Sequence, residues 1–501
     1  MADRIRKLDE RYQEYLRDES RLSGRGDTIS FPETGEELVR TARELLGQGI
    51  PITVQGSRTG IAGAAVPQGG HILSTEKLCA VGEIRREGER VLVTAEPGAR
   101  LSQLAACLAA QAPGFRFPPD PTEESATLGG AFACSAKGMN ACRWGDTAAY
   151  VEGAELLLAD GSLVELRRGE CLFDRTGCTL PGGRRLEIGP LPASSPWDRG
   201  PLGLREGADL LDVLAGSEGM LGIVTRLELA ALLEPAEQWG VLFFFREPEG
   251  AAAFARRAME LDGAGELPGA GVAAAELYHR EALRLAGEFK SRTSRLKAIP
   301  DFPEGAACAL YLELEGEDPD AMEEALLALL EAFGECGGEE NDTWAGAGAG
   351  EMEKFRLLRH AVPEAVNAAV DEARRADPEV VKLAADFTAP FARLEETLAM
   401  YEEGIAASGM TGVIFGHISQ NHLHVNLLPK SREEWLRGRA LLEEWAEKIA
   451  AWGGLVVSEN GVGKLKRELL RAYAPPEALA AAGTLKRLLD PRGLLNPGNM
   501  L

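Results

Sequence analysis

The sequence lacks any uninterrupted apolar run of about 18 residues, the length that a membrane-crossing helix needs. Its N-terminus, Met1–Glu10, is charged and has no apolar region typical of a secretory signal. We therefore expect a cytoplasmic location, or attachment to a membrane surface through a partner protein, and no transmembrane segment.

Cysteine pairs of the C-x-x-C type are also missing, although the chain has eight cysteines. Ligation of an iron–sulfur cluster by ferredoxin-type cysteine runs is therefore not expected. Cys171 and Cys178 are close enough in sequence to pair or to bind a metal, but two loop thiols of a cytosolic protein are more often free.

The chain has fewer basic than acidic residues: 54 Lys and Arg and 78 Asp and Glu, which gives a net charge of −24. This balance argues against binding nucleic acid or an anionic membrane through bulk charge. A local basic pocket for a small anion remains compatible with it.

A glycine-rich loop follows the β-branched residues Ile52–Val54, with Gly56, Gly60 and Gly63 in close succession. Glycine lets the backbone approach a ligand closely, so such a loop can surround a diphosphate with N–H groups. The spacing G-x-x-x-G-x-x-G differs from the dinucleotide fingerprint G-x-G-x-x-G, and the P-loop signature is absent. An ordinary surface loop therefore stays open as the alternative.

Three of the six histidines lie close together, as His417, His422 and His424. A two-residue turn at 420–421 would join two strands and place His417 opposite His424. Because alternate residues of a strand share a face, His422 and Asn426 would project to the same side. Opposed residues have Cβ atoms roughly 4.5–5.5 Å apart, so two such imidazoles can share one divalent cation. The alternative is a half-buried hairpin with incidental polar residues.

A carboxylate ends a second apolar stretch, where Leu455–Val457 leads to Glu459. A lone glutamate after a strand is commonly a solvated end or a helix cap. Beside the histidine hairpin, it would supply the third ligand of a site with two histidines, one carboxylate and open positions, for which zinc is the divalent metal that we expect.

Together, these motifs resemble those of FAD-linked oxidases of the vanillyl-alcohol oxidase and p-cresol methylhydroxylase type. Within that family the sequence is similar to the D-2-hydroxy-acid dehydrogenases, such as glycolate oxidase catalytic subunits, D-lactate dehydrogenases and D-2-hydroxyglutarate dehydrogenases. The resemblance covers most of residues 27–235 and 350–501. The stretches that carry it are Gly56–Pro67, Pro119–Pro121, Thr127–Gly130, Gly216–Thr225, 412–428 and 455–464.

The resemblance implies an α+β fold, with a two-part FAD-binding domain of p-cresol methylhydroxylase type and an α/β cap domain over a mainly antiparallel sheet. The stretches 241–258 and 309–333 each predict a strand followed by a helix, which agrees with such a cap. The expected divisions are an N-terminal helical extension over 1–26, the FAD-binding domain over 27–235, the cap and substrate domain over 236–483 and a return to the FAD domain over 484–501.

Non-covalent FAD binding is also implied. Nothing around His71 matches a known linkage signal, so we do not expect it to attach the flavin. The family's Asn-Ala-Gly-Gly element appears here as Cys134–Gly138, a departure at those contacts. The cofactor contacts implied by the resemblance are Gly56, Ser57, Arg58, Thr59, Gly60, Pro119, Asp120, Thr127, Gly129, Gly130, Ser135, Gly138, Glu218, Gly222, Ile223 and Asn496.

The same resemblance implies a substrate and metal site. Its metal ligands would be His417, His424 and Glu459, its carboxylate anchors Arg359 and, more loosely, Lys382, and Asn426 would lie near the substrate. For both anchors, a helix-surface arginine and lysine is the alternative.

One departure affects the general base. The family's histidine after the glutamate is Asn460 here, and an amide cannot act as a base near neutral pH. We expect His422 to replace it, because its side chain shares the face of His424 and an ordinary imidazole titrates near pH 6.5.

The implied reaction is FAD-dependent dehydrogenation of a D-2-hydroxy acid of the lactate, glycolate or 2-hydroxyglutarate class to the 2-oxo acid. The arginine anchors the carboxylate, the metal lowers the pKa of the hydroxyl, His422 takes the proton and hydride passes to flavin N5. Electrons then leave to an external acceptor or a partner protein, and a homodimer is compatible with the sequence. Two alternatives stay open: a flavin-binding subunit with lost or altered catalysis, and a metal-free flavin oxidase of another substrate.

Overall fold

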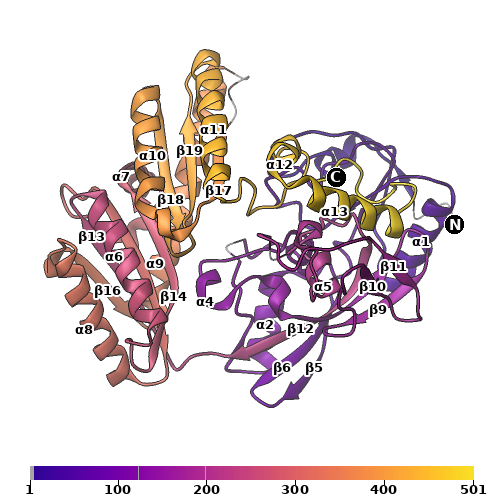
Figure 1. The fold of residues 1–501 in the computed structure, drawn as a ribbon, viewed down its shortest axis with the longest axis horizontal. Helices are drawn as coiled ribbons and strands as arrows, with labels where there is room; N and C mark the ends of the chain where they lie inside the picture. Colours follow the sequence, from indigo (N-terminus) through magenta and orange to yellow (C-terminus); the bar gives the residue numbers. More distant parts are fainter. Residues whose placement is uncertain (1–4, 122, 198, 378–379, 381) are drawn as a thin grey trace. The chain divides into compact units, whose positions relative to one another are not determined.

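The computed structural model describes residues 5–121, 123–197, 199–377, 380 and 382–501, and Figure 1 shows the course of the chain. The chain divides into two compact units. The first comprises Met1–Gly138, Gly145–Glu234 and Val457–Leu501, and the second comprises Met139–Trp144 and Pro235–Val456. The chain thus rejoins the first unit from residue 457, earlier than the expected 484. Within the described ranges, no helix is both long and apolar enough to span a bilayer.

The N-terminal segment differs from the expected helical extension, and residues 1–4 of that extension lie outside the described part. Strand β1 (Arg6–Lys7) pairs with β2 (Thr28–Ser30), and a 3-10 helix, η1 (Glu10–Leu16), follows. Asp9 caps η1 by accepting a hydrogen bond from the backbone N–H of Arg11 at 3.0 Å. The helix prediction is wrong here because pairing with a sheet edge outweighs the local helical pattern.

The smaller sheet of the first unit has the order β1-β2-β4-β3, with β2, β3 (Ile52–Gln55) and β4 (His71–Ser74) mutually parallel. The sequence over 33–48 predicts an amphipathic helix with Leu38, Ala42, Leu45 and Leu46 on one side. Helix α1 (Gly35–Gly47) confirms it: these four residues are buried, and the helix contacts β3 and β4. The glycine-rich loop connects β3 to β4, so it leaves the carboxyl end of a buried parallel strand.

The larger sheet of this unit is antiparallel, with the order β5-β6-β12-β8-β9 and β7 paired to β12. In the sequence, Asp160 and Gly161 between two apolar stretches predict a hairpin, and the pairing of β8 with β9 confirms it. Residues 167–205 are rich in Gly, Pro and Arg, which predicts a long loop, and this stretch contains a small hairpin, β10 with β11. The strands of this part are β5 (Val81–Glu87), β6 (Arg90–Ala95), β7 (Phe115–Arg116), β8 (Val151–Leu157), β9 (Leu163–Arg167), β10 (Gly177–Thr179), β11 (Arg185–Glu187) and β12 (Ile223–Leu233). Its helices are α2 (Leu101–Gln111), α3 (Leu128–Cys134), η2 (Thr147–Tyr150), η3 (Pro201–Gly203), α5 (Leu210–Leu214), α12 (Arg467–Tyr473) and α13 (Pro476–Leu489).

The second unit is built on one antiparallel sheet with the order β16-β13-β15-β14-β18-β19-β17. Its strands are β13 (Glu237–Phe245), β14 (Ala270–His279), β15 (Cys308–Gly316), β16 (Thr343–Ala347), β17 (Leu383–Thr388), β18 (Thr411–His417) and β19 (His422–Leu428). Its helices are α4 (Ala141–Trp144), α6 (Pro248–Gly263), α7 (Arg280–Arg292), η4 (Ser294–Ala298), α8 (Pro319–Glu335), η5 (Glu340–Asp342), α9 (Ala349–Ala376), η6 (Phe391–Arg393), α10 (Leu394–Ser408), η7 (Ile418–Gln420) and α11 (Arg432–Ala451).

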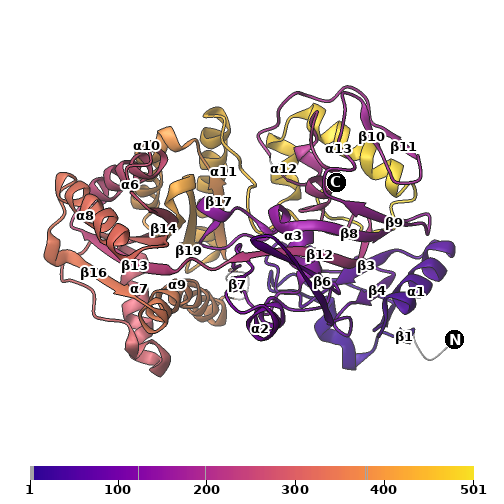
Figure 2. The same cartoon turned by 90° about the horizontal axis from the view of Figure 1, so that it is seen from below.

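Helices cover both faces of this sheet. Figure 2 shows α7 and α9 on one face and α6, α8 and α10 on the other. On the α6 and α8 face, Phe243 packs against Phe254 and Phe333 with ring centroids 4.7 and 5.0 Å apart. On the α7 and α9 face, the buried core includes Tyr278 and Phe415, so the strand alternation sends successive side chains to two different cores.

Candidate functional site

The glycine-rich loop offers backbone donors that the protein itself does not use. Within the described residues, no N–H group from Ser57 to Ala64 donates a hydrogen bond to another part of the chain. A Cβ placed on Gly60 would meet nothing within 4 Å. The loop therefore has both the donors and the open space that an anionic diphosphate requires, and FAD fits it on this ground.

The predicted motifs of the first unit meet at this loop. A Cβ on Gly56 would lie 2.1 Å from Oγ1 of Thr127, so only glycine permits this close approach. Thr127 is the N-cap of α3 and accepts a hydrogen bond from the N–H of Gly130 at 3.2 Å. The hydroxyl of Ser57 donates to the carbonyl of Ser125 at 2.6 Å. The loop is thus fastened to the start of α3, where Gly129 also lies.

The segment with Pro119 and Asp120 packs against the altered glycine element. A Cβ on Gly138 would lie 2.0 Å from the carbonyl oxygen of Asp120 and 2.3 Å from that of Pro119. Ser135 adopts a left-handed conformation (φ 48°) at the end of α3, and its hydroxyl donates to Asp146 at 2.9 Å. At Gly138 the backbone therefore packs too closely against Pro119 and Asp120 for any side chain to fit.

Asn496 and Glu218 use their side chains to join distant segments. The Asn496 amide donates to the carbonyl of Glu218 at 2.6 Å, and its oxygen accepts from the N–H of Val54 at 2.9 Å. The Glu218 carboxylate accepts from the N–H groups of Val462 and Gly463. Burial raises the pKa of Glu218 despite these hydrogen bonds. Asn496 therefore joins the C-terminal segment to β3 and to Glu218, and the Glu218 side chain contacts residues 462–463. All of the implied cofactor residues, Thr59, Gly222 and Ile223 included, lie in the first unit.

His71 has both ring nitrogens engaged by hydroxyl groups. Its Nδ1 lies 2.8 Å from Oγ1 of Thr28, and its Nε2 lies 2.7 Å from Oγ of Ser30. Burial lowers the pKa of His71 to about 4, so the ring is neutral at pH 7. Both ring nitrogens of His71 are therefore occupied by hydroxyl partners on β2.

In the second unit, the histidine hairpin has a different register from the predicted one. His417 lies opposite His422, and Phe415 lies opposite His424. The predicted pairing of His417 with His424 is wrong because the turn takes up Ile418–Asn421 instead of two residues. The shift is by two positions, so the same side chains stay on one face.

The three imidazoles therefore cluster as the sequence predicts. Ring centroids are 5.9 Å apart for His417 and His422, 5.7 Å for His417 and His424, and 4.9 Å for His422 and His424. Asn426 lies on the same strand and face and is buried.

Each histidine has a polar partner directly opposite it on a neighbouring strand. His417 faces Glu276 of β14, and its Nδ1 contacts the Glu276 carboxylate. His424 faces Asp386 of β17, with Nδ1 2.9 Å from the carboxylate. A carboxylate on Nδ1 leaves Nε2 as the nitrogen that coordinates a metal, an arrangement common among metal-binding histidines. His422 instead faces Thr388, whose hydroxyl lies 2.8 Å from Nδ1.

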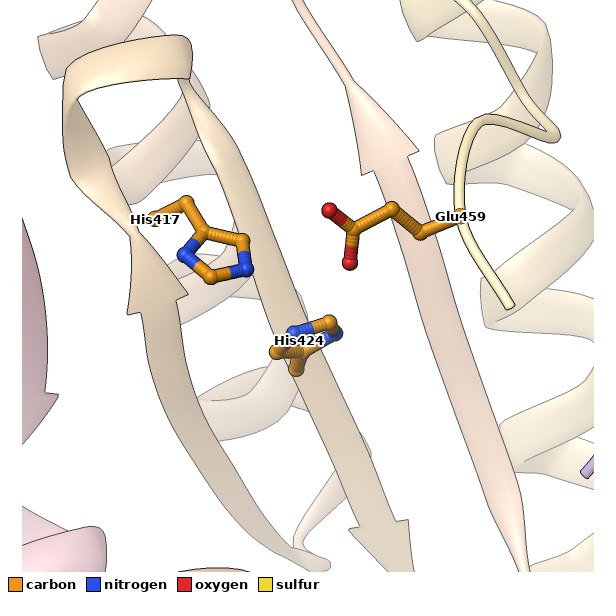
Figure 3. Close-up of side chains that lie close together, drawn as sticks. All are labelled: His417, His424 and Glu459. Atoms are coloured by element: carbon orange, nitrogen blue, oxygen red, sulfur yellow. The ribbon is translucent and has the colours of Figure 1, made fainter. Parts of the chain in front are cut away.

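Glu459 is the third member of the predicted ligand set, and Figure 3 shows it with His417 and His424. One potential ligand atom from each of the three residues lies within 4.8 Å of the other two. Leu455, just upstream, pairs with Thr388 at the edge of the histidine sheet and so fixes where this stretch begins. Two imidazoles and one carboxylate are the kinds of ligand that a divalent cation such as zinc takes.

Glu276 also contacts the predicted carboxylate anchor. Its second oxygen lies 3.0 Å from Nε of Arg359, and both side chains are buried. Burial opposes ionisation of Glu276, but His417 and Arg359 outweigh it and hold the pKa of Glu276 below its ordinary value. The Glu276 contact uses Nε of Arg359, and the terminal guanidinium nitrogens donate no hydrogen bond within the described chain.

The remaining predicted residues lie differently. Lys382 is exposed and immediately precedes β17. Asn460 is exposed and adopts a left-handed conformation (φ 62°), which asparagine tolerates better than most residues. The position at which the family has a histidine is therefore part of a turn here.

Sequence reasoning missed Glu276 and Asp386. Each is a single acidic residue in an otherwise apolar strand, Val272–Tyr278 and Leu383–Phe387. A lone carboxylate at a core-facing position needs a charged or hydrogen-bonding partner. A single acidic residue within an apolar strand could therefore have indicated that these two side chains contact functional groups.

Comparison with known proteins supports the assignment of both units. Residues 234–500 match the family described as FAD linked oxidases, C-terminal domain, and residues 27–167 match the family described as FAD binding domain. The chain is 28% identical over 478 residues to a Danio rerio protein named "Probable D-lactate dehydrogenase, mitochondrial", covering 95% of this chain and 84% of that protein. It is 26% identical to "Glycolate oxidase subunit GlcD" of Bacillus subtilis over 478 residues, covering 95% and 88%.

Solved structures are similar at the level of the fold. p-Cresol methylhydroxylase with bound substrate has a TM-score of 0.69 at 16% identity, covering 100% of this chain and 94% of that chain. 4-Ethylphenol oxidase from Gulosibacter chungangensis has a TM-score of 0.68 at 17% identity, with the same coverage. These likenesses confirm the predicted α+β fold class, and the family match covers more than half of the sequence. The chain therefore belongs to the FAD linked oxidases and is an FAD-dependent oxidoreductase.

Proposed function

We propose that this protein oxidises a small D-2-hydroxy acid to the corresponding 2-oxo acid, with FAD held by the glycine-rich loop and a divalent metal held by His417, His424 and Glu459. The observation that carries the proposal is the pair of carboxylate–imidazole contacts, Glu276 with His417 and Asp386 with His424, beside Glu459. Such outer carboxylates orient imidazole ligands and raise their basicity. Relatives named D-lactate dehydrogenase and glycolate oxidase subunit favour a hydroxy-acid substrate.

Arg359 is the residue that we assign to the substrate carboxylate. A guanidinium presents a planar fork that matches a carboxylate, and burial strengthens such an ion pair. Glu276 holds the Nε edge of the arginine, which orients the terminal nitrogens. Lys382 is a weaker candidate for the same role, because its side chain is exposed.

His422 is the residue that we assign as general base. It is buried, its ring lies beside both histidine ligands, and Thr388 fixes the orientation of its Nδ1. An imidazole in this position can take the hydroxyl proton of the substrate. Asn426, buried on the same face, is positioned to hydrogen bond to the substrate.

The two absent groups would supply the remaining chemistry. FAD held by the glycine-rich loop would supply the two-electron chemistry, and a divalent cation held by His417, His424 and Glu459 would supply Lewis acidity. An external acceptor would be needed to reoxidise the flavin.

An anaerobic screen of hydroxy acids for flavin bleaching tests the proposal. The purified protein should contain FAD, and one D-2-hydroxy acid should reduce it faster than the L-enantiomer does. Removal of the metal with a chelator should slow the reduction, and added zinc should restore it. If no hydroxy acid bleaches the flavin, a non-catalytic flavin subunit replaces the proposal. If bleaching is insensitive to chelation and metal content is negligible, a metal-free oxidase replaces it.

A further inference from the structure

The N-terminal segment runs along the glycine-rich loop from its first residue to its last. At the start, the side-chain amide of Gln55 donates to the carbonyl of Tyr15 at 2.8 Å. At the end, the N–H of Arg25 donates to the carbonyl of Pro67 at 3.0 Å, and the N–H of Gly69 donates back to Arg25 at 2.6 Å. All of these residues lie in the first unit.

Arg58, in the middle of the loop, has a left-handed backbone (φ 61°). Non-glycine residues adopt this conformation rarely, and it persists where surrounding contacts hold it. An alternation of right- and left-handed residues also turns successive N–H groups toward one point, which is how backbone loops bind anions. The conformation of Arg58 therefore matters for the donors on either side of it.

Three contacts hold Arg58, and all three come from the N-terminal segment. The guanidinium lies over the ring of Tyr15, 4.1 Å from its centroid. A terminal nitrogen lies 3.6 Å from the carboxylate of Glu14. The carbonyl of Arg58 accepts a hydrogen bond from the N–H of Glu19 at 3.2 Å.

Tyr15 is itself fixed in place. Its side chain is buried beside Ile29 and Ile72, and its hydroxyl donates to Glu76 at 2.7 Å. The ring that supports Arg58 therefore belongs to a small core and does not move freely at the surface.

We infer that the segment Glu14–Arg25 holds the glycine-rich loop in the conformation that binds FAD. Within it, Tyr15 is a positioning residue that affects FAD binding through its contact with Arg58. The inference rests on the proposed role of this loop in FAD binding. The N-terminal segment is then a part of the first unit on which cofactor affinity depends.

Equilibrium binding of FAD to the apo form of the full-length chain tests this inference. Tyr15→Leu keeps apolar volume but removes the aromatic face, and should raise the FAD dissociation constant about tenfold. Tyr15→Phe keeps the face and should bind FAD as the parent does. Tyr12→Leu is the matched control: its ring lies 5.8 Å from that of Phe31 and 6.3 Å from that of Tyr15, and the arginine over it is Arg11, so the contact of Tyr15 with Arg58 stays in place.

A double-mutant cycle separates positioning from a general loss of stability. Arg58→Lys keeps the charge but removes the planar group that stacks on the ring, so it should weaken FAD binding on its own. Tyr15→Leu should then add little in the Arg58→Lys background, because both changes remove one interaction. Full additivity of the two effects would overturn the inference. Should Tyr15→Leu fail to fold, Arg58→Gln combined with Glu14→Ala carries the corresponding comparison, because both changes remove the ion pair between Arg58 and Glu14.

Gly60→Ala distinguishes failure of the inference from failure of the proposed function. If Gly60→Ala weakens FAD binding but Tyr15→Leu does not, the loop binds FAD without support from the N-terminal segment, and the inference is wrong. If neither variant changes the dissociation constant, the loop is not the FAD site, and both proposals fall.

Discussion

Glu276 and His417 lie directly opposite each other on β14 and β18, and the Glu276 carboxylate contacts Nδ1 of the histidine ring. The other oxygen of the same carboxylate lies 3.0 Å from Nε of Arg359. One fully buried acid therefore orients both a proposed metal ligand and the proposed substrate anchor. Such a charge is stable in the interior only because two cationic or proton-donating groups face it.

Glu276→Gln should lower zinc affinity about 10–100-fold and raise the KM for the hydroxy acid, because the amide cannot hold both partners by charge. Competition with a chromophoric chelator measures the first effect, and steady-state kinetics with an artificial dye measures the second. Glu313→Gln is the matched control, since Glu313 is also buried in this sheet but accepts from the Tyr311 hydroxyl. Equal zinc affinity in Glu276→Gln and Glu313→Gln would show that Glu276 has no specific role.

His422→Asn should retain FAD and metal but reduce flavin about 10²–10⁴-fold more slowly, the usual range for a positioned general base. His424→Asn should lose metal as well, because its ring is a proposed ligand. Anaerobic stopped-flow measurement of flavin bleaching, together with metal analysis of each variant, separates the two roles. Flavin reduction at the parental rate in His422→Asn would show that His422 is not the base.

The clustering of histidines was predictable because it depends on strand alternation alone, and a register shift of two residues leaves the faces unchanged. The register itself was not, since it depends on whether the turn uses two residues or the four of Ile418–Asn421. The contact between Glu276 and His417 could not be predicted from the sequence, for a different reason. Glu276 is 141 positions from His417, and only the strand order β14-β18-β19 brings the two together.

In the first unit, too, local sequence patterns predict structure correctly, whereas contacts between residues far apart in the sequence were not predicted. The apolar stripe of α1 and the hairpin at Asp160 and Gly161 are local patterns, and both were predicted correctly. The N-terminal segment has a helical pattern over part of its length, yet Arg6 pairs with Ile29 and Tyr15 joins a core with Ile72. These partners are distant in sequence, so local propensity could not reveal them.

Gly60→Ala should weaken FAD binding about tenfold without affecting folding. A Cβ at this position meets no protein atom within 4 Å, so the methyl group would extend into space that we assign to the cofactor. Gly47→Ala is the control, because a Cβ there also meets no atom within 4 Å but lies at the end of α1. FAD titration with circular dichroism on each variant measures both properties. An unchanged FAD affinity in Gly60→Ala would place the diphosphate elsewhere.

His71 should make the protein less stable in mild acid. Burial holds the pKa of His71 at about 4, whereas an unfolded histidine titrates near 6.5, so the unfolded chain binds a proton that the folded chain excludes. Its contribution to stability is therefore complete above pH 6.5 and declines as the pH falls toward 4.

His71→Gln removes this titration while keeping a polar side chain between Thr28 and Ser30. The variant will be less stable at pH 7, since it loses part of the packing and one well-oriented pair of hydrogen bonds. Between pH 7 and pH 4.5, however, the parent should lose roughly 2 kcal/mol more than the variant does, which is the free energy of the proton bound only by the unfolded chain. Urea denaturation at the two pH values measures this difference directly. If parent and variant lose the same amount of stability, the His71 ring accepts a proton in the folded state, and its two hydroxyl partners do not hold it neutral.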